Sequence, residues 1–377
     1  MKLNHIHILN YKNIREAKLK FSSNVNCFVG ANGMGKTNFL DAIYYLSFAK
    51  SAVNVVDNYN ITHGEGFFML QGEYTDDYGS VDMFTCSLKQ GSRKHLKRND
   101  KDYRKISEHI GSVPLVLISP ADSSLVSGGS EERRRFLNGV ISQYDALYLE
   151  AVMRYERSLK QRNTLMKREE EPDWGVVDVL EDLMAVDAKL IFEKRTAFIE
   201  EFLPIFQDLY RKLSGKSSEL VDIEYLSHGH RGDLKKLLIE ERQKARIIGY
   251  TLHGVHKDDL DFRLNTYPMK REGSQGQTKT YLIALKMAQF LYLKTKGEKR
   301  VPILLLDDIF DKLDADRVSQ IVKYVSGDDF GQIFITDTNR EHLDSIVQET
   351  THDYCLFHVS DGHIISETYA ADTTGND

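Results

Sequence analysis

The most constraining feature of this sequence is a glycine-rich segment at residues 28–38, FVGANGMGKTN. Gly30, Gly35, Lys36 and Thr37 fill the pattern G-x-x-x-x-G-K-[ST]. An apolar run precedes the segment and a stretch with helical periodicity follows it. Glycines let the backbone N–H groups turn inward around a phosphate, and the helix N-terminus adds positive potential. The segment therefore predicts a phosphate-binding loop between a buried strand and a helix of an α/β fold.

The chemistry of this loop predicts ATP and Mg²⁺ as cofactors. Lys36 is expected to reach the β- and γ-phosphates, and the hydroxyl of Thr37 is expected to ligate Mg²⁺. The alternative is a glycine loop before an ordinary helix, and the strand-then-helix context argues against it. The residues of the loop predicted to bind nucleotide are Gly30, Ala31, Asn32, Gly33, Met34, Gly35, Lys36, Thr37 and Asn38.

Composition limits the class of protein. The 377 residues are 41% hydrophobic, which allows two or three units with sizeable cores, and no apolar run is long enough to span a membrane. The N-terminus does not read as a signal peptide, and the three cysteines have no C-x-x-C spacing, so we expect a cytoplasmic protein without a membrane partner. The net charge of −6 means that any DNA contact must come from local basic patches.

Such a patch lies at residues 89–105, which hold eight Lys or Arg and two Asp. Residues 98–101, RNDK, are expected to form the tip of a hairpin. The functional interpretation is contact with a DNA backbone, and the alternative is a solvated, charged hairpin. The patch alone does not decide between them. The candidate DNA-binding residues are Lys94, Lys97, Arg98, Lys101, Arg104 and Lys105.

Hydrophobic periodicity predicts the first elements. Alternation favours half-buried strands, and the turn residues at 76–80 indicate a hairpin. The predicted elements are strands at 2–9, 16–21 and 25–29, a helix at 38–49, short strands between 66 and 88, and a strand at 113–118.

A long helical region follows. The pattern is helical over residues 131–213, with Ser130 as the expected N-cap and an interruption at residues 172–175. No heptads persist over three or four repeats, so the region predicts a pair of antiparallel helices rather than a long coiled coil. We expect a helical insertion domain at 121–213.

Strands are expected to return at 220–226 and 261–265, flanking a helix at 232–246. Residues 250–260 are dense in polar groups, and a surface loop there is as well supported as any functional role. Further elements are predicted as a helix at 277–294, strands at 301–308 and 332–336, a helix at 315–325, strands near 354–359 and 363–368, and a disordered tail at 371–377.

Two carboxylates end the apolar strand at 301–308. The carboxyl end of a parallel strand is where α/β folds bind ligands. Asp307 is expected to hold Mg²⁺ through water, so the predicted metal residues are Thr37 and Asp307. Asp308 is expected to orient or deprotonate the attacking water, and the alternative is a helper of that base.

A second anion site is predicted at S-Q-G-Q, residues 274–277, where Ser274 and Gly276 begin a helix. One phosphate cannot easily use two such sites of one subunit. We therefore expect Ser274 to meet the γ-phosphate held by the loop of another subunit, which makes ATP the link of a head-to-head dimer. The predicted catalytic residues are Lys36, Asp308 and, in trans, Ser274.

These motifs resemble the ABC-type ATPase heads, among them the SMC and Rad50 proteins, and most closely the RecF family of bacterial repair proteins. The resemblance runs from Lys2 to about Glu367 and includes residues 128–138, 159–163 and 256–259, besides S-Q-G-Q and L-L-L-D-D. It implies an ABC-type ATPase head, a P-loop fold with a mixed, largely parallel sheet and helices, at residues 1–120 and 214–370.

The resemblance also implies a weak, DNA-stimulated ATPase that forms an ATP-dependent homodimer. Such a protein would bind gapped, single-stranded and duplex DNA, favour gap junctions, and work with RecR and RecO to load RecA. This sequence departs from the family pattern at Val255, at Lys257 and at residues 122–124.

Three other functions were weighed against these motifs. The nucleotide-binding subunit of a transporter is disfavoured by the basic hairpin and the helical insertion. A structural SMC-like head would need long coiled-coil arms, which the sequence lacks. A small-molecule kinase would have no use for the S-Q-G-Q helix.

Overall fold

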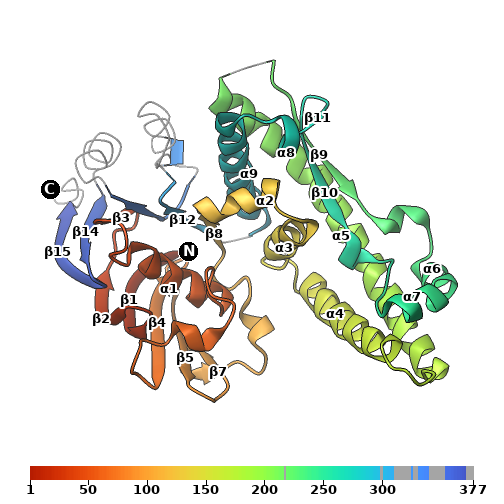
Figure 1. Ribbon diagram of the computed structural model, residues 1–377. Helices are drawn as coiled ribbons and strands as arrows, with labels where there is room; N and C mark the ends of the chain where they lie inside the picture. The colour runs from red at the N-terminus through yellow and green to blue at the C-terminus, as the bar shows by residue number, and fades with distance from the viewer. Residues whose placement is uncertain (216–217, 298–299, 310–323, 326–329, 339–352, 371–377) are drawn as a thin grey trace. The chain divides into compact units, whose positions relative to one another are not determined.

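The computed structural model describes residues 1–215, 218–297, 300–309, 324–325, 330–338 and 353–370 (Figure 1). The chain forms two compact units, one of Met1–Ala121 with Gln289–Asp377 and the other of Asp122–Ala288. The predicted helix at 315–325 lies almost wholly outside the described residues, and the tail at 371–377 lies entirely outside them.

The first unit contains an antiparallel sheet with the strand order β2-β1-β4-β5-β6-β7. Alternate residues of β1, such as Leu3, Ile6 and Ile8, are buried, and one register shift near Leu3 adjusts the alternation. The predicted strands and the hairpin at 76–80 are confirmed. The strands are β1 Lys2–Tyr11, β2 Ile14–Lys20, β4 Phe67–Thr75, β5 Val81–Lys89, β6 His95–Arg98 and β7 Lys101–Asp102.

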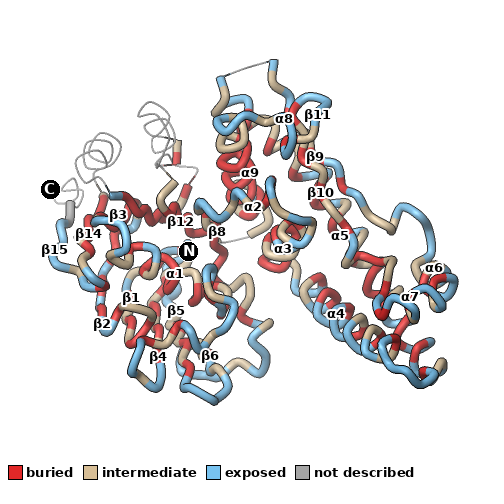
Figure 2. The backbone as a smooth tube through the Cα atoms, viewed as in Figure 1, coloured by how far each residue is buried: buried red, intermediate tan, exposed pale blue. Residues whose placement is uncertain are grey.

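A second sheet of the same unit has the order β15-β14-β3-β13-β12-β8, parallel except for β15. Every residue of β3, β12 and β13 is buried, as expected for parallel strands covered on both faces (Figure 2). This arrangement confirms the predicted α/β fold. The strands are β3 Val25–Val29, β8 Leu115–Ile118, β12 Ile303–Asp307, β13 Ile333–Asp337, β14 Tyr354–Ser360 and β15 His363–Ala370.

Helix α1, Lys36–Phe48, packs against strands of both sheets. Its Phe39, Leu40, Ile43 and Leu46 are buried in one hydrophobic core with side chains from β1, β4, β3 and β12. Because the helix begins directly after the glycine-rich loop, this packing fixes the position of the loop at the carboxyl end of β3.

The second unit is built on two long helices, α4 Ala146–Met166 and α5 Trp174–Ser214. Ion pairs of Arg154 with Asp187 and of Arg162 with Glu181 show that the helices run antiparallel, as predicted. The carboxylate of Asp173 caps α5 by accepting the N–H groups of residues 175 and 176.

The remaining elements of this unit include a three-stranded sheet, β11-β10-β9. Helix α3 begins at Ser130 itself, with Gly129 as the capping residue and no side-chain cap, so the predicted N-cap role of Ser130 is wrong. The helix expected at 232–246 is two short helices that meet at Glu241. The elements are α2 Ser123–Ser127, α3 Ser130–Ile141, β9 Val221–Leu226, α6 Leu234–Glu240, α7 Arg242–Ile248, β10 Asp259–Leu264, β11 Tyr267–Pro268, α8 Met269–Glu272 and α9 Gln275–Lys296, of which the residues from Gln289 onward belong to the first unit.

Single turns of 3₁₀ helix connect several of these elements. They lie at Asp57–Asn60, Ile106–His109, Pro120–Asp122, His228–Arg231 and Val255–Lys257.

The polar segment at 250–260 is not a surface loop. Asp258 is fully buried, and its carboxylate accepts hydrogen bonds from Arg195 at 2.6 Å, from Ser227 at 2.6 Å and from the hydroxyl of Tyr225. Polar side chains of this segment therefore take part in a buried network at the middle of α5, around Arg195.

The boundaries of the two compact units differ from those of the predicted domains. Residues 214–288, expected to belong to the ATPase head, fall in the second unit, because β9 packs against α5 and β10 packs against α3. That residues 121–213 form a functional domain of their own stays a prediction. None of the helices that the structure describes is both long and apolar enough to cross a bilayer.

Candidate nucleotide-binding site

The glycine-rich loop connects β3 to α1 and is shaped by close contacts. A Cβ atom on Gly30 would lie 2.3 Å from the carbonyl oxygen of Val359. Gly35 has φ 102°, and a Cβ atom there would lie 2.5 Å from the side-chain amide of Asn13. Only glycine fits both positions, which is the structural reason for the spacing of the motif.

Two turns support the loop from outside. The Asn13 amide group lies 3.5 Å from the carbonyl of Met34, and its oxygen accepts a hydrogen bond of 2.7 Å from Asn38. The N–H of Gly362, in the β14–β15 turn, donates to the same Met34 carbonyl at 2.8 Å. Asn13 and Gly362 were not predicted as supports, because nothing in the sequence places their turns against this loop.

The side chain of Lys36 folds back over the loop. Its ammonium donates to the carbonyl oxygens of Gly30 at 2.7 Å and of Ala31 at 3.0 Å. Burial lowers the pKa of Lys36, while the nearby carboxylates of Asp308 and Asp307 oppose that effect. The cation therefore lies where a phosphate chain cradled by this loop would need it.

Asp307 joins the loop to the neighbouring strands. Its Oδ1 atom accepts one hydrogen bond from the hydroxyl of Thr37 at 2.9 Å and another from the hydroxyl of Thr336 at 2.8 Å. Burial raises the pKa of Asp307, and these two hydrogen bonds oppose the effect. The structure thus brings Asp307 to Lys36 and Thr37, although Asp307 lies 270 residues after Thr37 in the sequence.

Asp308 adopts the left-handed conformation, with φ 49°, and its N–H donates to Thr336 at 2.9 Å. It lines a pocket of about 210 Å³ over the loop. Asp308 is therefore at the pocket surface, whereas Asp307 is buried behind it. The pocket is lined by Asn32, Gly33, Gly35, Lys36, Thr37, Asn38, Asp308 and Thr336.

The donors at Thr37 and Asp307 fit Mg²⁺. This cation takes oxygen ligands and is usually held by one or two carboxylates together with phosphate oxygens and water. The hydroxyl of Thr37 and a carboxylate oxygen of Asp307 lie within 2.9 Å of each other. Within the described residues, no group of three His, Cys, Asp or Glu side chains is arranged to hold a metal, so phosphate and water would supply most of the ligands.

Ser274 and Gly276 lie exposed at the start of α9 in the second unit. The N–H of Ser274 donates to the side-chain oxygen of Gln277 at 2.9 Å, and the N–H of Gln277 donates to the Ser274 hydroxyl at 3.2 Å. This reciprocal capping box gives S-Q-G-Q a structural role. A role for Ser274 or Gly276 toward a nucleotide in trans stays a prediction.

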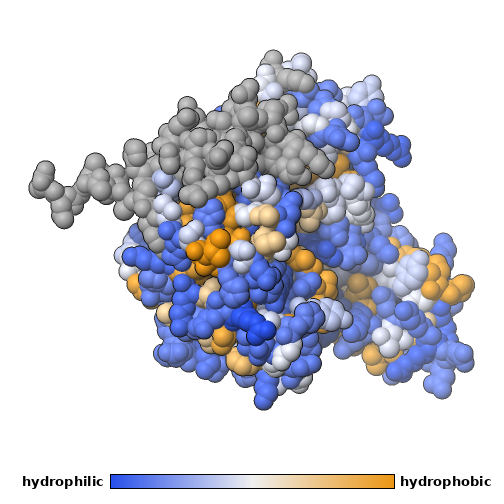
Figure 3. Space-filling model, turned by 60° about the vertical axis from the view of Figure 1, so that its left-hand side comes forward, coloured by the Kyte–Doolittle hydropathy of each residue, from blue (hydrophilic) through white to orange (hydrophobic). Residues whose placement is uncertain are grey.

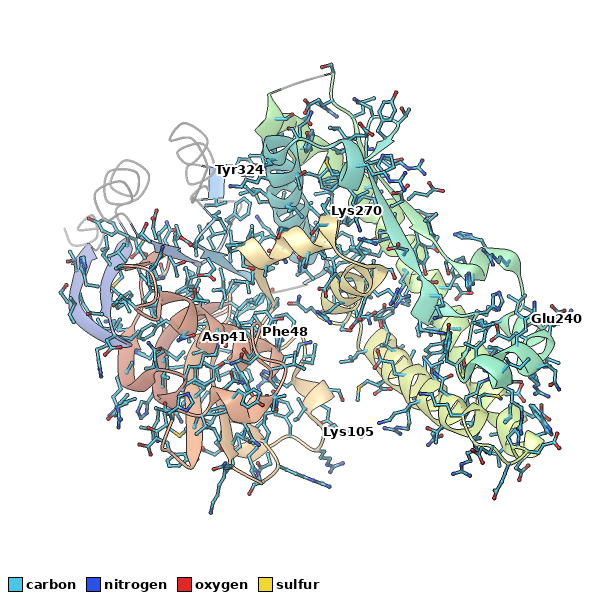
Figure 4. The ribbon with its side chains drawn as sticks, in the orientation of Figure 1. Asp41, Phe48, Lys105, Glu240, Lys270 and Tyr324 are labelled. Atoms are coloured by element: carbon cyan, nitrogen blue, oxygen red, sulfur yellow. The ribbon has the colours of Figure 1, made fainter. Side chains whose placement is uncertain are left out.

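The basic segment forms the β6–β7 hairpin, and its tip lies at 98–101 as predicted. Asn99 and Asp100 both have positive φ, which suits a tight two-residue turn. Lys101, Arg104 and Lys105 are exposed, and Figure 4 shows Lys105 at the edge of its unit with its side chain directed outward.

Two residues of this segment are engaged internally. Lys94 donates to the carboxylate of Asp57 at 2.7 Å and also to a backbone carbonyl and a tyrosine hydroxyl, so it must be removed from the DNA-binding candidates. The guanidinium of Arg98 donates two hydrogen bonds to the carboxylate of Asp82, at 2.6 and 2.9 Å. Lys97 is half-buried on the sheet face beside Asp102.

Comparison with known proteins places these features in a family. The model of the RecF/RecN/SMC N-terminal domain matches residues 2–359. A protein of Phocaeicola vulgatus described as DNA replication and repair protein RecF is 54% identical over 97% of this chain and 98% of the relative. A protein of Porphyromonas gingivalis with the same description is 48% identical over 97% of this chain and the full length of the relative.

Solved structures agree with the sequence relatives. The recombination mediator protein RecF with ATP, from the RecFOR pathway, superposes with a TM-score of 0.87 at 26% identity and covers 98% of both chains. The Smc head domain of Pyrococcus furiosus has a TM-score of 0.56 at 15% identity, covering 98% of this chain and 96% of the Smc chain, which shows a shared fold alone. With its P-loop, paired carboxylates and full-length relatives, the chain belongs to the RecF family of DNA replication and repair proteins, within the RecF/RecN/SMC N-terminal domain family.

Proposed function

We propose that this protein is an ATP-dependent DNA-binding protein of recombinational repair that hydrolyses ATP slowly and uses it as a switch. The observation that carries the proposal is the junction at Asp307, where one carboxylate oxygen meets the hydroxyls of Thr37 and Thr336. A P-loop hydroxyl beside a strand-end carboxylate is the arrangement used by P-loop ATPases.

Each residue of the pocket has a proposed task in hydrolysis. Lys36 neutralises the β- and γ-phosphates, and Asp308 orients the attacking water or accepts its proton. Thr37 and Asp307 hold Mg²⁺, which when bound adds positive charge beside the phosphate oxygens. The products are ADP and inorganic phosphate.

ATP is proposed to join two copies of the chain head to head. Ser274 and Gly276 are exposed at a helix N-terminus, where an anion is favoured. In the proposed dimer they meet the γ-phosphate bound by the P-loop of the other copy. Lys36, Asp308 and the Ser274 in trans then form the complete catalytic set.

The proposed DNA contact is the exposed side of the β6–β7 hairpin, through Lys97, Lys101, Arg104 and Lys105, with Arg98 held beside them by Asp82. We propose gapped DNA, with its single-stranded and duplex parts, as the substrate surface. The family resemblance supports partners of the RecR and RecO type, the loading of RecA, and a cytoplasmic location.

Light scattering with and without ATP and Mg²⁺ tests the dimer. We expect the wild-type protein to become a dimer with ATP, and Ser274→Arg to bind nucleotide yet remain monomeric. Thr164→Arg, another change of an exposed helical hydroxyl residue, is the matched control and should dimerise. Normal dimerisation of Ser274→Arg would contradict the role of Ser274 in trans.

Binding to gapped, single-stranded and duplex DNA, measured with and without ATP, tests the second half of the proposal. We expect tighter binding in the presence of ATP and a preference for the gapped substrate. Equal, ATP-independent binding to all three would argue against an ATP-driven DNA switch.

A further inference from the structure

Thr336, near the end of β13, contacts the carboxylate of Asp307 and the backbone of Asp308 through one hydroxyl group. The hydroxyl donates to Oδ1 of Asp307 at 2.8 Å and accepts the backbone N–H of Asp308 at 2.9 Å. The side chain is almost fully buried, with 1% of its surface exposed. One hydroxyl therefore serves as donor to one acidic residue and as acceptor from the next.

The strand register explains why this residue holds that position. Strand β13 lies between β12 and β3, and Thr336 pairs with Asp307 on one side and with Phe28 on the other. The next residue on the strand, Asp337, accepts the N–H of Gly30 through its carbonyl at 3.3 Å. Thr336 is thus on the strand that links the phosphate-binding loop to the paired carboxylates.

The contact with Asp308 bears on the reaction. Asp308 has a positive φ, which non-glycine residues rarely adopt and which surrounding contacts must hold in place. The hydroxyl of Thr336 binds the N–H of this same residue. This hydrogen bond lies at the point where the chain turns after Asp307, on the residue that lines the pocket.

We propose that Thr336 is a positioning residue for ATP hydrolysis: its hydroxyl fixes Asp307 behind the P-loop and Asp308 at the surface of the pocket. The inference rests on the proposed ATPase function. Thr336 acts through the two carboxylates, so its loss should affect turnover more than nucleotide binding.

Thr336→Val tests the inference, because valine keeps the shape of threonine but has no hydroxyl. We expect kcat to fall about 100-fold, in line with the cost of misplaced reacting groups, while KM for ATP changes less than about threefold. Thr336→Ser restores the hydroxyl, so its kcat should return to within a few-fold of wild type. Thr85→Val, at a threonine on the outer face of β5, is the matched control and should keep full activity.

Fluorescent-nucleotide binding and thermal unfolding complete the experiment. A wild-type kcat in Thr336→Val would overturn the inference while leaving the proposed function intact. Loss of nucleotide binding and stability in Thr336→Val without rescue by serine would also overturn it, since the role would then be structural. A wild-type protein that fails to hydrolyse ATP would overturn both the inference and the proposed function.

Discussion

Asp307 and Asp308 are adjacent in the chain but have different surroundings. Asp307 is buried and accepts two hydroxyl hydrogen bonds, whereas Asp308 lies at the surface of the pocket. Of the two residues, only Asp308 lines the pocket over the P-loop. This difference supports the proposal that Asp307 serves the metal and Asp308 serves the attacking water.

Asp308→Asn should therefore separate binding from hydrolysis. We expect the variant to bind ATP and form the dimer, with kcat reduced at least about 100-fold because the amide cannot accept a proton. Single-turnover hydrolysis and light scattering on the same sample measure both effects. Unchanged turnover would remove Asp308 from the proposed catalytic role.

At the scale of elements, the β6–β7 hairpin shows that the cations of one basic run in the sequence can have two different environments. The ammonium of Lys94 is bound internally by Asp57, while Lys101, Arg104 and Lys105 are exposed. Figure 3 shows that on the face it draws the described surface is largely hydrophilic, with apolar side chains gathered in small groups. The side chains of Lys101, Arg104 and Lys105 are therefore accessible to phosphate groups.

Reversing the charge of Lys101, Arg104 and Lys105 to Glu should weaken DNA binding. Each lost phosphate contact should reduce the slope of log K against log salt by about 0.9 for duplex DNA. A salt titration of DNA affinity measures the slope, and an unchanged slope would mean that the hairpin is only a solvated surface. Lys94→Met is the control, expected to lower the melting temperature without changing the slope.

The middle of α5 is held by a buried ion pair. Arg195 and Asp258 are 3% and 0% exposed, and their charged groups are 2.6 Å apart. Burial of a charge is tolerated only when a partner of opposite charge remains beside it. The same carboxylate holds Tyr225 and Ser227, so one residue connects α5 with β9 and the loop that follows β9.

Asp258→Asn should destabilise the second unit by about 3–5 kcal/mol, because it leaves Arg195 buried without a counter-charge. The single tryptophan, Trp174, lies at the start of α5, so its fluorescence measures the unfolding of this unit in urea. Nucleotide binding by the first unit should persist. An unfolding curve that matches the wild type would contradict the importance of the pair.

At the scale of the whole molecule, each unit holds a histidine ring set into its interior: His109 is fully buried in the first unit, and His256 is half-buried in the second. Burial lowers the pKa of His109 to about 4 in the first unit and of His256 to about 4 in the second. Nε2 of His109 must carry the proton, because it lies 2.6 Å from the carbonyl of Leu46, which can only accept. Each ring therefore takes up its proton at a lower pH in the folded state than in the unfolded chain.

The free energy of unfolding should therefore fall as pH falls from about 6.5 toward 4. In that window the two histidine rings bind protons in the unfolded chain but not in the folded chain, so acid favours unfolding. Each ring contributes up to about 3 kcal/mol to the free energy of unfolding. Above pH 6.5 this stability is fully present. Urea unfolding at pH 7.5 and at pH 5 measures the difference.

His109→Gln is the variant that isolates the first unit, because glutamine can still donate to Leu46 but does not titrate. Its stability should depend less on pH than that of the wild type. Equal dependence in both proteins would show that burial of His109 does not control acid sensitivity.

Much of this molecule follows from local patterns in its sequence. The P-loop spacing, the alternation in β1 and β4, the apolar run of β12 and the long helical periodicity of α4 and α5 are local signals, and all of them correspond to elements of the structure. They succeed because backbone geometry and burial on one face act over a few residues. The contact between Thr37 and Asp307 could also be predicted from the sequence, since each residue belongs to a motif with known chemistry.

Only the tertiary structure decided the parts that depend on contacts between distant segments. Asn13 and Gly362 support the P-loop, Lys94 binds Asp57 rather than solvent, and Thr336 binds the carboxylate of Asp307 and the backbone N–H of Asp308. No local pattern marks these residues, because their neighbours in space are many residues away in the chain. The sequence by itself determined that the chain carries a phosphate-binding loop and two strand-end carboxylates, while sheet order decided which hydroxyl groups hold those carboxylates in place.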